Sequence, residues 1–135
     1  LGDGRLGNGK RLISVTATGE GTFQVEPGRY RLRISRGPEY DLHEEADFVL
    51  GSGDVKNVNA ILHREVDTSG WIGADLHLHA TPSFDSGMPL PRRVTTVAAE
   101  GVEFALATDH DAETDYSPII LSQNLQAYLK SAVSA

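Results

Sequence analysis

Two stretches of the sequence, WIGADLHLH at residues 71–79 and VEFALAT at residues 102–108, decide the fold class. In a strand, successive side chains point to opposite faces, so the first stretch places Asp75, His77 and His79 on one face. The second stretch is a nearly unbroken apolar run, which is typical of a strand covered on both faces. Both stretches therefore predict strands of an α/β unit.

The segment between these two strands predicts a loop and then a helix. Residues 80–90 form the loop, and the helix runs from about Pro91 to Glu100, because proline suits the first helical turn. Gly101 suits the position just after the helix end. A second helix is predicted from Ser122 to Val133. Its expected apolar side consists of Leu121, Leu125, Tyr128, Leu129 and Ala132. The second half of the chain thus predicts the order βαβα.

The first half has a different pattern, made of short strands and turns. Alternation predicts strands at residues 13–17 and 30–35, and a later strand at residues 55–62. Pro27 followed by Gly28 suits a type II turn. Strands at this spacing predict a small antiparallel β-sandwich over residues 1–66. Residues 67–70 then form a linker, and residues 71–135 form the α/β part.

Histidines and carboxylates gather where the two predicted parallel strands end. His77 and His79 are two residues apart, so their imidazoles can converge on one cation. Asp85 follows in the next loop, and His110 follows the second strand. Adjacent strands are only ~4.8 Å apart, so groups at the same end of both can share a metal site. The alternative for His77 and His79 alone is an exposed edge strand with two solvated imidazoles.

The run DLHLHATPSFDSG, a helix and then GVEFALATDHD together resemble the first two motifs of the PHP (polymerase-and-histidinol-phosphatase) superfamily of metallohydrolases. Within it, the segment SRGPEYDL and the junction VDTSGWIGADLHLHA are most similar to the carbaryl-hydrolase-like branch of bacterial enzymes. The segment from Thr22 through Tyr40 is similar to carboxypeptidase-regulatory-like modules. These resemblances imply a β-sandwich before a distorted (β/α)7 barrel.

The PHP resemblance also implies a ligand set and a chemistry. Four residues correspond to metal ligands: His77, His79, Asp85 and His110. Asp75 and Asp109 correspond to carboxylates that orient an imidazole through its other nitrogen. A complete site implies two or three divalent ions, which are zinc, manganese or iron. The implied activity is hydrolysis of phosphoesters, or of related carbamate and carboxyl esters, by metal-activated water.

The sequence departs from the PHP pattern after its second motif. The family completes its metal cluster with a later Glu, further His residues and an Asp-x-His pair. We therefore expect only the first two of seven barrel strands here, in a fragment of a two-domain hydrolase that is inactive by itself. One alternative is a non-catalytic binding or spacer module with a degenerate barrel. Another is pairing with a second chain that carries the remaining strands.

Composition narrows the classes of partner. A net charge of −7 argues against nucleic acid as the main partner. The PHP resemblance implies a small-molecule ester as the partner instead. No stretch reaches the ~20 apolar residues that a membrane span requires. The chain has no cysteine, so any metal must be bound by His, Asp or Glu. Lack of cysteine is compatible with either side of a bacterial inner membrane, and a periplasmic or secreted location is our expectation.

Other polar residues receive plainer interpretations. The acidic run at residues 39–47 lacks the ligand spacing of an EF-hand and predicts a solvated loop. The isolated His43 and His63 predict surface or structural roles. Ser83 and Ser86 lack the context of a serine nucleophile. Arg92 and Arg93 are expected to face solvent, with contact to an anionic substrate as the alternative.

Overall fold

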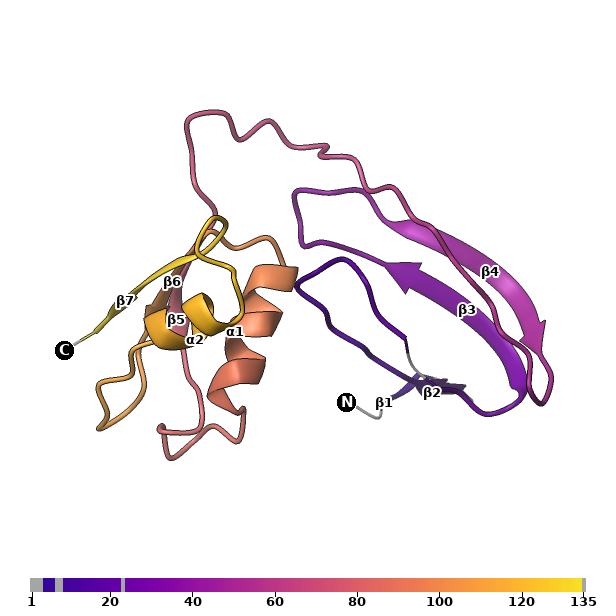
Figure 1. Cartoon of the computed structure of the whole chain (residues 1–135), viewed down its shortest axis with the longest axis horizontal. Coiled ribbons are helices and arrows are strands. Elements are labelled where there is room, and N and C mark those ends of the chain that lie inside the picture. Colours follow the sequence, from indigo (N-terminus) through magenta and orange to yellow (C-terminus); the bar gives the residue numbers. More distant parts are fainter. Residues whose placement is uncertain (1–3, 7–8, 23, 135) are drawn as a thin grey trace.

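The computed structural model describes residues 4–6, 9–22 and 24–134. Figure 1 shows two parts: a long curved β-ribbon built from the first half, and a compact α/β unit built from the second. Phe23, which belongs to the segment that resembles carboxypeptidase-regulatory-like modules, lies outside the described residues. Among those residues, no helix has the length and apolar character needed to cross a lipid bilayer.

The α/β unit is built on a parallel sheet with the strand order β5-β6-β7. The strands span Ala74–Leu78, Phe104–Ala107 and Lys130–Val133. Helix α1 (Leu90–Ala99) connects the first two, and helix α2 (Ser117–Ser122) lies between the last two. Within the described residues this sheet is open, so closure into a barrel stays a prediction.

The first crossover agrees with its prediction. Helix α1 buries Val94 and Val97, and its Pro91 occupies the first turn. Gly101 follows the helix with a φ of +75°, a left-handed conformation that glycine adopts at little cost. The apolar run at 102–108 contains β6, which pairs in parallel with β5.

The prediction for residues 122–133 is wrong. The helix in this region ends at Ser122, and residues 130–133 form β7, which pairs in parallel with β6. Asn124 has a φ of +57°, and asparagine tolerates this left-handed conformation at a helix end. The expectation of only two barrel-type strands is corrected by the same finding. The α/β order is βαβαβ.

The core lies between the sheet and its helices. Its best-buried large side chains include Tyr116 and Leu129, and each is at most 1% exposed. Ala105 and Ala107 of β6 are buried in the same cluster. Small side chains on the central strand let the helices pack closely on the sheet, because little side-chain volume separates them.

The first half forms two separate antiparallel pairs within the described residues. Strands β1 (Gly4–Leu6) and β2 (Gly9–Arg11) make one pair, and β3 (Gly28–Ile34) and β4 (His43–Leu50) make the other. The strands predicted at residues 13–17 and 55–62 are wrong, because neither stretch pairs in a ladder. A single sandwich for this half therefore stays a prediction.

The acidic run predicted to be a loop is instead largely strand β4. Glu44 lies beside Arg31 and Arg33 of β3, and Glu45 forms an ion pair with Lys56 at 2.7 Å. These cations offset the repulsion between neighbouring carboxylates, which allows an acidic strand. Asp47 has a φ of +46° where the register shifts, as at a β-bulge.

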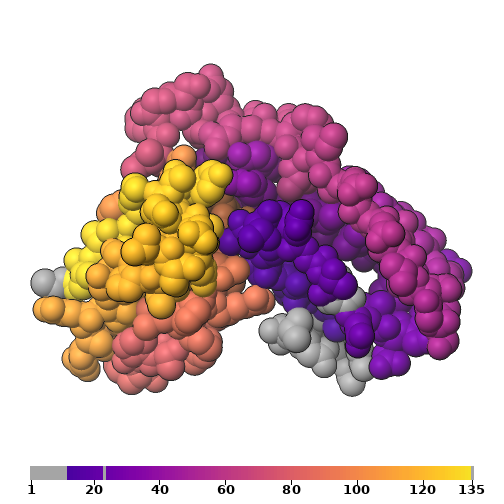
Figure 2. Space-filling model, viewed as in Figure 1, coloured from indigo at the N-terminus to yellow at the C-terminus, as the bar shows by residue number. Residues whose placement is uncertain are grey.

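The two parts touch through loops far apart in sequence. Ala17 packs against the core of the α/β unit, and the Arg92 guanidinium donates to the Val15 carbonyl at 3.3 Å. Loop 36–40 lies against the end of α1, where Gly37 approaches the Glu100 backbone. Figure 2 shows this contact between the indigo N-terminal segment and the orange and yellow residues. Arg92 therefore does not simply face solvent, contrary to its prediction.

Candidate metal centre

The candidate site begins where β5 loses its regular alternation. The β5–β6 register shifts between Asp75 and Leu78, and the side chains of Leu76 and His77 are both exposed. The Asp75 carboxylate accepts a hydrogen bond from the His77 backbone N–H at 3.1 Å. The side chain of Asp75 thus satisfies a backbone group at the irregular position, and the predicted common face of Asp75, His77 and His79 is interrupted.

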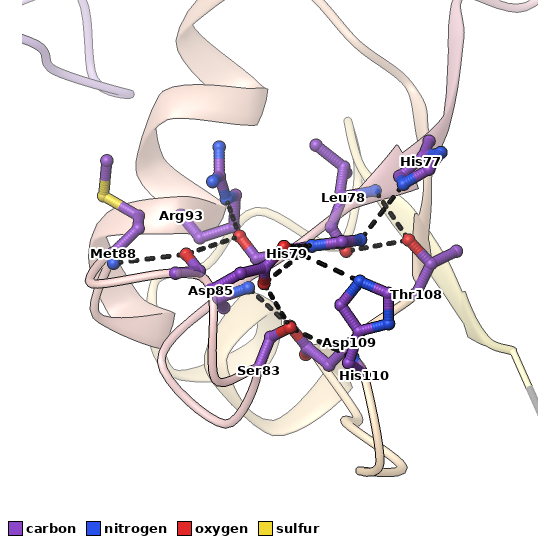
Figure 3. A network of polar contacts seen from close by, with 12 residues as sticks. His77, Leu78, His79, Ser83, Asp85, Met88, Arg93, Thr108, Asp109 and His110 are labelled. Carbon is purple, nitrogen blue, oxygen red and sulfur yellow. Dashed lines mark hydrogen bonds and ion pairs between the residues drawn. The ribbon is translucent and has the colours of Figure 1, made fainter.

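The side chains of the four predicted ligands lie close together (Figure 3). His77 Nε2 is 3.0 Å from His79 Nε2, and His79 Nδ1 is 3.0 Å from both oxygens of Asp85. His110 Nε2 lies 3.6 Å from Asp85 Oδ2. The structure therefore brings all four side chains together, and His79 contacts each of the other three, since its ring centroid is 4.7 Å from that of His110.

One compact subset of these residues could hold a cation. His79, Asp85 and His110 each offer a ligand atom, and these atoms all lie within 4.8 Å of one another. His77 is adjacent through His79, but it is not one of this group. Two imidazoles with one carboxylate fit a first-row divalent metal such as zinc, iron or manganese, so the donor set agrees with the expected cofactor.

The environment of Asp85 favours its charged form. The hydrogen bond from the Ser83 hydroxyl lowers the pKa of Asp85, and so do its hydrogen bond with His79 and the nearby His110. Partial burial acts in the opposite direction and raises the pKa, but the lowering contributions prevail. Asp85 is therefore an ionised carboxylate at neutral pH, which is the form that binds metal.

Two backbone anchors fix the ends of the parallel strands that carry the site. The Thr108 hydroxyl accepts from the Leu78 N–H at 3.0 Å and donates to the Leu78 carbonyl at 3.1 Å. The Arg93 guanidinium donates to the His79 carbonyl at 2.8 Å. Arg93 thus holds the β5 end from helix α1, which differs from the solvent-facing role predicted for it.

The two predicted orienting carboxylates do not contact imidazoles by hydrogen bonds in the described residues. Asp75 binds the His77 backbone, and Asp109 Oδ1 accepts from the Ala80 N–H at 2.5 Å. The second oxygen of Asp109 is buried and has no hydrogen-bond partner there. Both carboxylates accept hydrogen bonds from backbone N–H groups near the site. That they orient imidazoles stays a prediction.

Ser83 is the polar residue of the site that sequence reasoning missed. It is 1% exposed, and its hydroxyl donates to Asp85 Oδ1 at 2.6 Å while accepting from the His110 N–H at 3.0 Å. A serine two residues before a candidate ligand is a local signal for such a bond, because short hydroxyl side chains bind nearby groups in turns.

Tyr116 places a second unpartnered polar atom in the core near Asp109. Its hydroxyl is buried and lacks a hydrogen-bond partner among the described residues. Burial, and then the negative charge of Asp109, raises the pKa of Tyr116 to about 12 from the usual 10.0. Desolvation disfavours the phenolate, so the side chain stays neutral at physiological pH.

We expect an alkaline absorbance titration of the phenols to show one late step near pH 12, which Tyr116→Phe removes. The pKa of Tyr116 is higher in the folded state than in the unfolded state. The stabilisation of the folded state that follows from this difference is complete below pH 10 and is lost as the pH rises through about 12. At pH 7, Tyr116→Phe is expected to be neutral or slightly stabilising, because it removes an unpartnered buried hydroxyl. A late step that survives in the variant would contradict this assignment.

Comparisons of the chain with protein-family profiles, with curated proteins and with solved structures find no match to any of them. The geometry of the site therefore carries the functional argument.

Proposed function

We propose that this chain carries part of the active site of a metal-dependent hydrolase of phosphoesters or of related carbamate and carboxyl esters. The observation that supports this proposal is the convergence of His79, Asp85 and His110, with His77 beside His79, at the ends of adjacent parallel strands. α/β enzymes commonly bind ligands at the carboxyl ends of their parallel strands. The resemblance to PHP enzymes points to the same reaction class.

Each residue has a definable part in such a site. His79, Asp85 and His110 would hold the cation, and His77 would extend the site on the far side of His79. When bound, a divalent metal supplies a Lewis acid that lowers the pKa of water and polarises an ester oxygen. Asp85 contributes negative charge to the site, while Thr108 and Arg93 keep the strand ends in register.

Metal content measured by mass spectrometry tests the proposal on the protein expressed from its natural reading frame. We expect bound first-row metal in the wild type, and loss of most of it in the His77→Ala/His79→Ala variant. Losing ligands is expected to weaken affinity more than ~100-fold, since even outer-shell changes cost 10–100-fold. His63→Gln is the matched control, because His63 lies outside the site and binds Asp41.

The outcomes separate the hydrolase from its alternative. Metal retained by the control and lost by the double variant supports the site and justifies assays with phosphate and carbamate esters. Absence of metal from the wild type, even after incubation with Zn²⁺ or Mn²⁺, would end the hydrolase proposal. The binding or spacer module would then be the better interpretation.

A further inference from the structure

We infer that Ser83 is a positioning residue of the metal centre, which sets the orientation of Asp85 and ties it to the loop that carries His110. This inference rests on the proposed function, because it concerns the same metal site. It assigns a role to a serine that lacks the sequence context of a nucleophile. Its basis is the set of contacts around the Ser83 hydroxyl.

The Ser83 hydroxyl joins two loops that carry candidate ligands. It donates to Asp85 Oδ1 at 2.6 Å, within its own loop after β5. It accepts at 3.0 Å from the backbone N–H of His110, which follows β6. A hydroxyl has one donor, so this arrangement uses the donor on the carboxylate and an acceptor lone pair on the second loop.

The backbone of Ser83 is itself held in a tight turn. Its N–H donates to the Ala80 carbonyl at 2.8 Å, and its carbonyl accepts from the Ser86 N–H at 3.2 Å. The side chain is 1% exposed, so water cannot easily replace its hydrogen bonds. Ser83 therefore occupies a fixed position from which it can hold Asp85.

The consequence for Asp85 is a fixed orientation of its carboxylate. Oδ1 is bound by Ser83, both oxygens lie 3.0 Å from His79 Nδ1, and Oδ2 also lies 3.6 Å from His110 Nε2. Because the Ser83 hydrogen bond restricts rotation of the Asp85 carboxylate, its oxygens stay directed toward the imidazole groups. Such outer hydrogen bonds typically contribute 10–100-fold to metal affinity.

The test measures Mn²⁺ affinity by titration calorimetry on the protein from its natural reading frame. We expect Ser83→Ala to bind Mn²⁺ about 10–100-fold more weakly than the wild type. Ser86→Ala is the matched comparison, because Ser86 lies in the same loop but, among the described residues, its hydroxyl bonds only backbone groups, the His79 carbonyl and the Met88 N–H. Its expected loss is below about threefold, less than one hydrogen bond is typically worth.

A double-mutant cycle distinguishes positioning from general loop stability. If Ser83 acts through Asp85, Ser83→Ala should change affinity less than about threefold in an Asp85→Ala background. Ser83→Cys is the second variant if Ser83→Ala does not fold, since the thiol is of similar size and a weak donor. Mn²⁺ prefers oxygen and nitrogen ligands, which limits direct binding by the new thiol.

Each result has one meaning. Equal losses in Ser83→Ala and Ser86→Ala, or an unchanged Ser83→Ala effect in the Asp85→Ala background, would overturn the role of Ser83 while leaving the metal site intact. A wild type that binds neither Mn²⁺ nor Zn²⁺ would instead overturn the proposed function, and the role of Ser83 with it.

Discussion

Replacing Gly37 with alanine is expected to lower the free energy of unfolding by about 2–5 kcal/mol, the sum of left-handed strain and overpacking. Gly37 has a φ of +72°, and a Cβ atom there would lie 2.0 Å from the Glu100 carbonyl oxygen. That oxygen belongs to the backbone after helix α1, so relief requires loop 36–40 to move. The added methyl group would therefore separate the two parts of the molecule where they touch.

Urea denaturation of Gly37→Ala beside Gly53→Ala measures this effect. Gly53 has a similar φ of +83°, but a Cβ atom there would meet nothing within 4 Å. The control therefore carries only the conformational cost, about 1–2 kcal/mol. The excess loss in Gly37→Ala reports the contact with Glu100. Equal losses in the two variants would show that loop 36–40 does not rest on the α/β unit in solution.

The site was more predictable than the first half of the chain, for a physical reason. Ligand residues follow strands whose parallel pairing is fixed by a short crossover, so His79 and His110 had to lie near one another. Asp85 was within reach because it is only the sixth residue after His79. The contacts of Ser83 and Arg93 depend on side-chain directions in loops and on the first turn of a helix, which periodicity does not encode.

In the first half, the strand predicted at residues 30–35 is confirmed by β3, but two other predicted strands are wrong, because alternation alone does not guarantee a ladder. Residues 55–62 include apolar side chains, yet Val55 is 83% exposed and Ile61 is 76% exposed, and no strand pairs with them among the described residues. Conversely, the acidic residues at 39–47 predict a loop, whereas most of them lie in strand β4. Cross-strand arginines on β3 supply the opposite charge that makes it a strand.

Truncating a buried leucine tests whether residues 130–133 form strand β7, as observed, or the end of the predicted helix. Leu129→Ala is expected to lower the free energy of unfolding by about 2–5 kcal/mol, because Leu129 is fully buried and its loss leaves a cavity. Leu121→Ala should cost less than about 1 kcal/mol, since surface changes are usually small and Leu121 is 63% exposed at the end of α2.

The contrast is decisive because the two structures rank these leucines differently. A continuous helix over residues 122–133, entered at Leu121, would place both leucines on one apolar side, so truncating either would cost similar amounts. In the observed structure, the left-handed conformation of Asn124 interrupts the helix. Of the two leucines, only Leu129 belongs to the buried core, which also includes residues of β6. Urea midpoints that fall equally for both variants would favour the helix, and with it a sheet of only two parallel strands carrying the candidate metal centre.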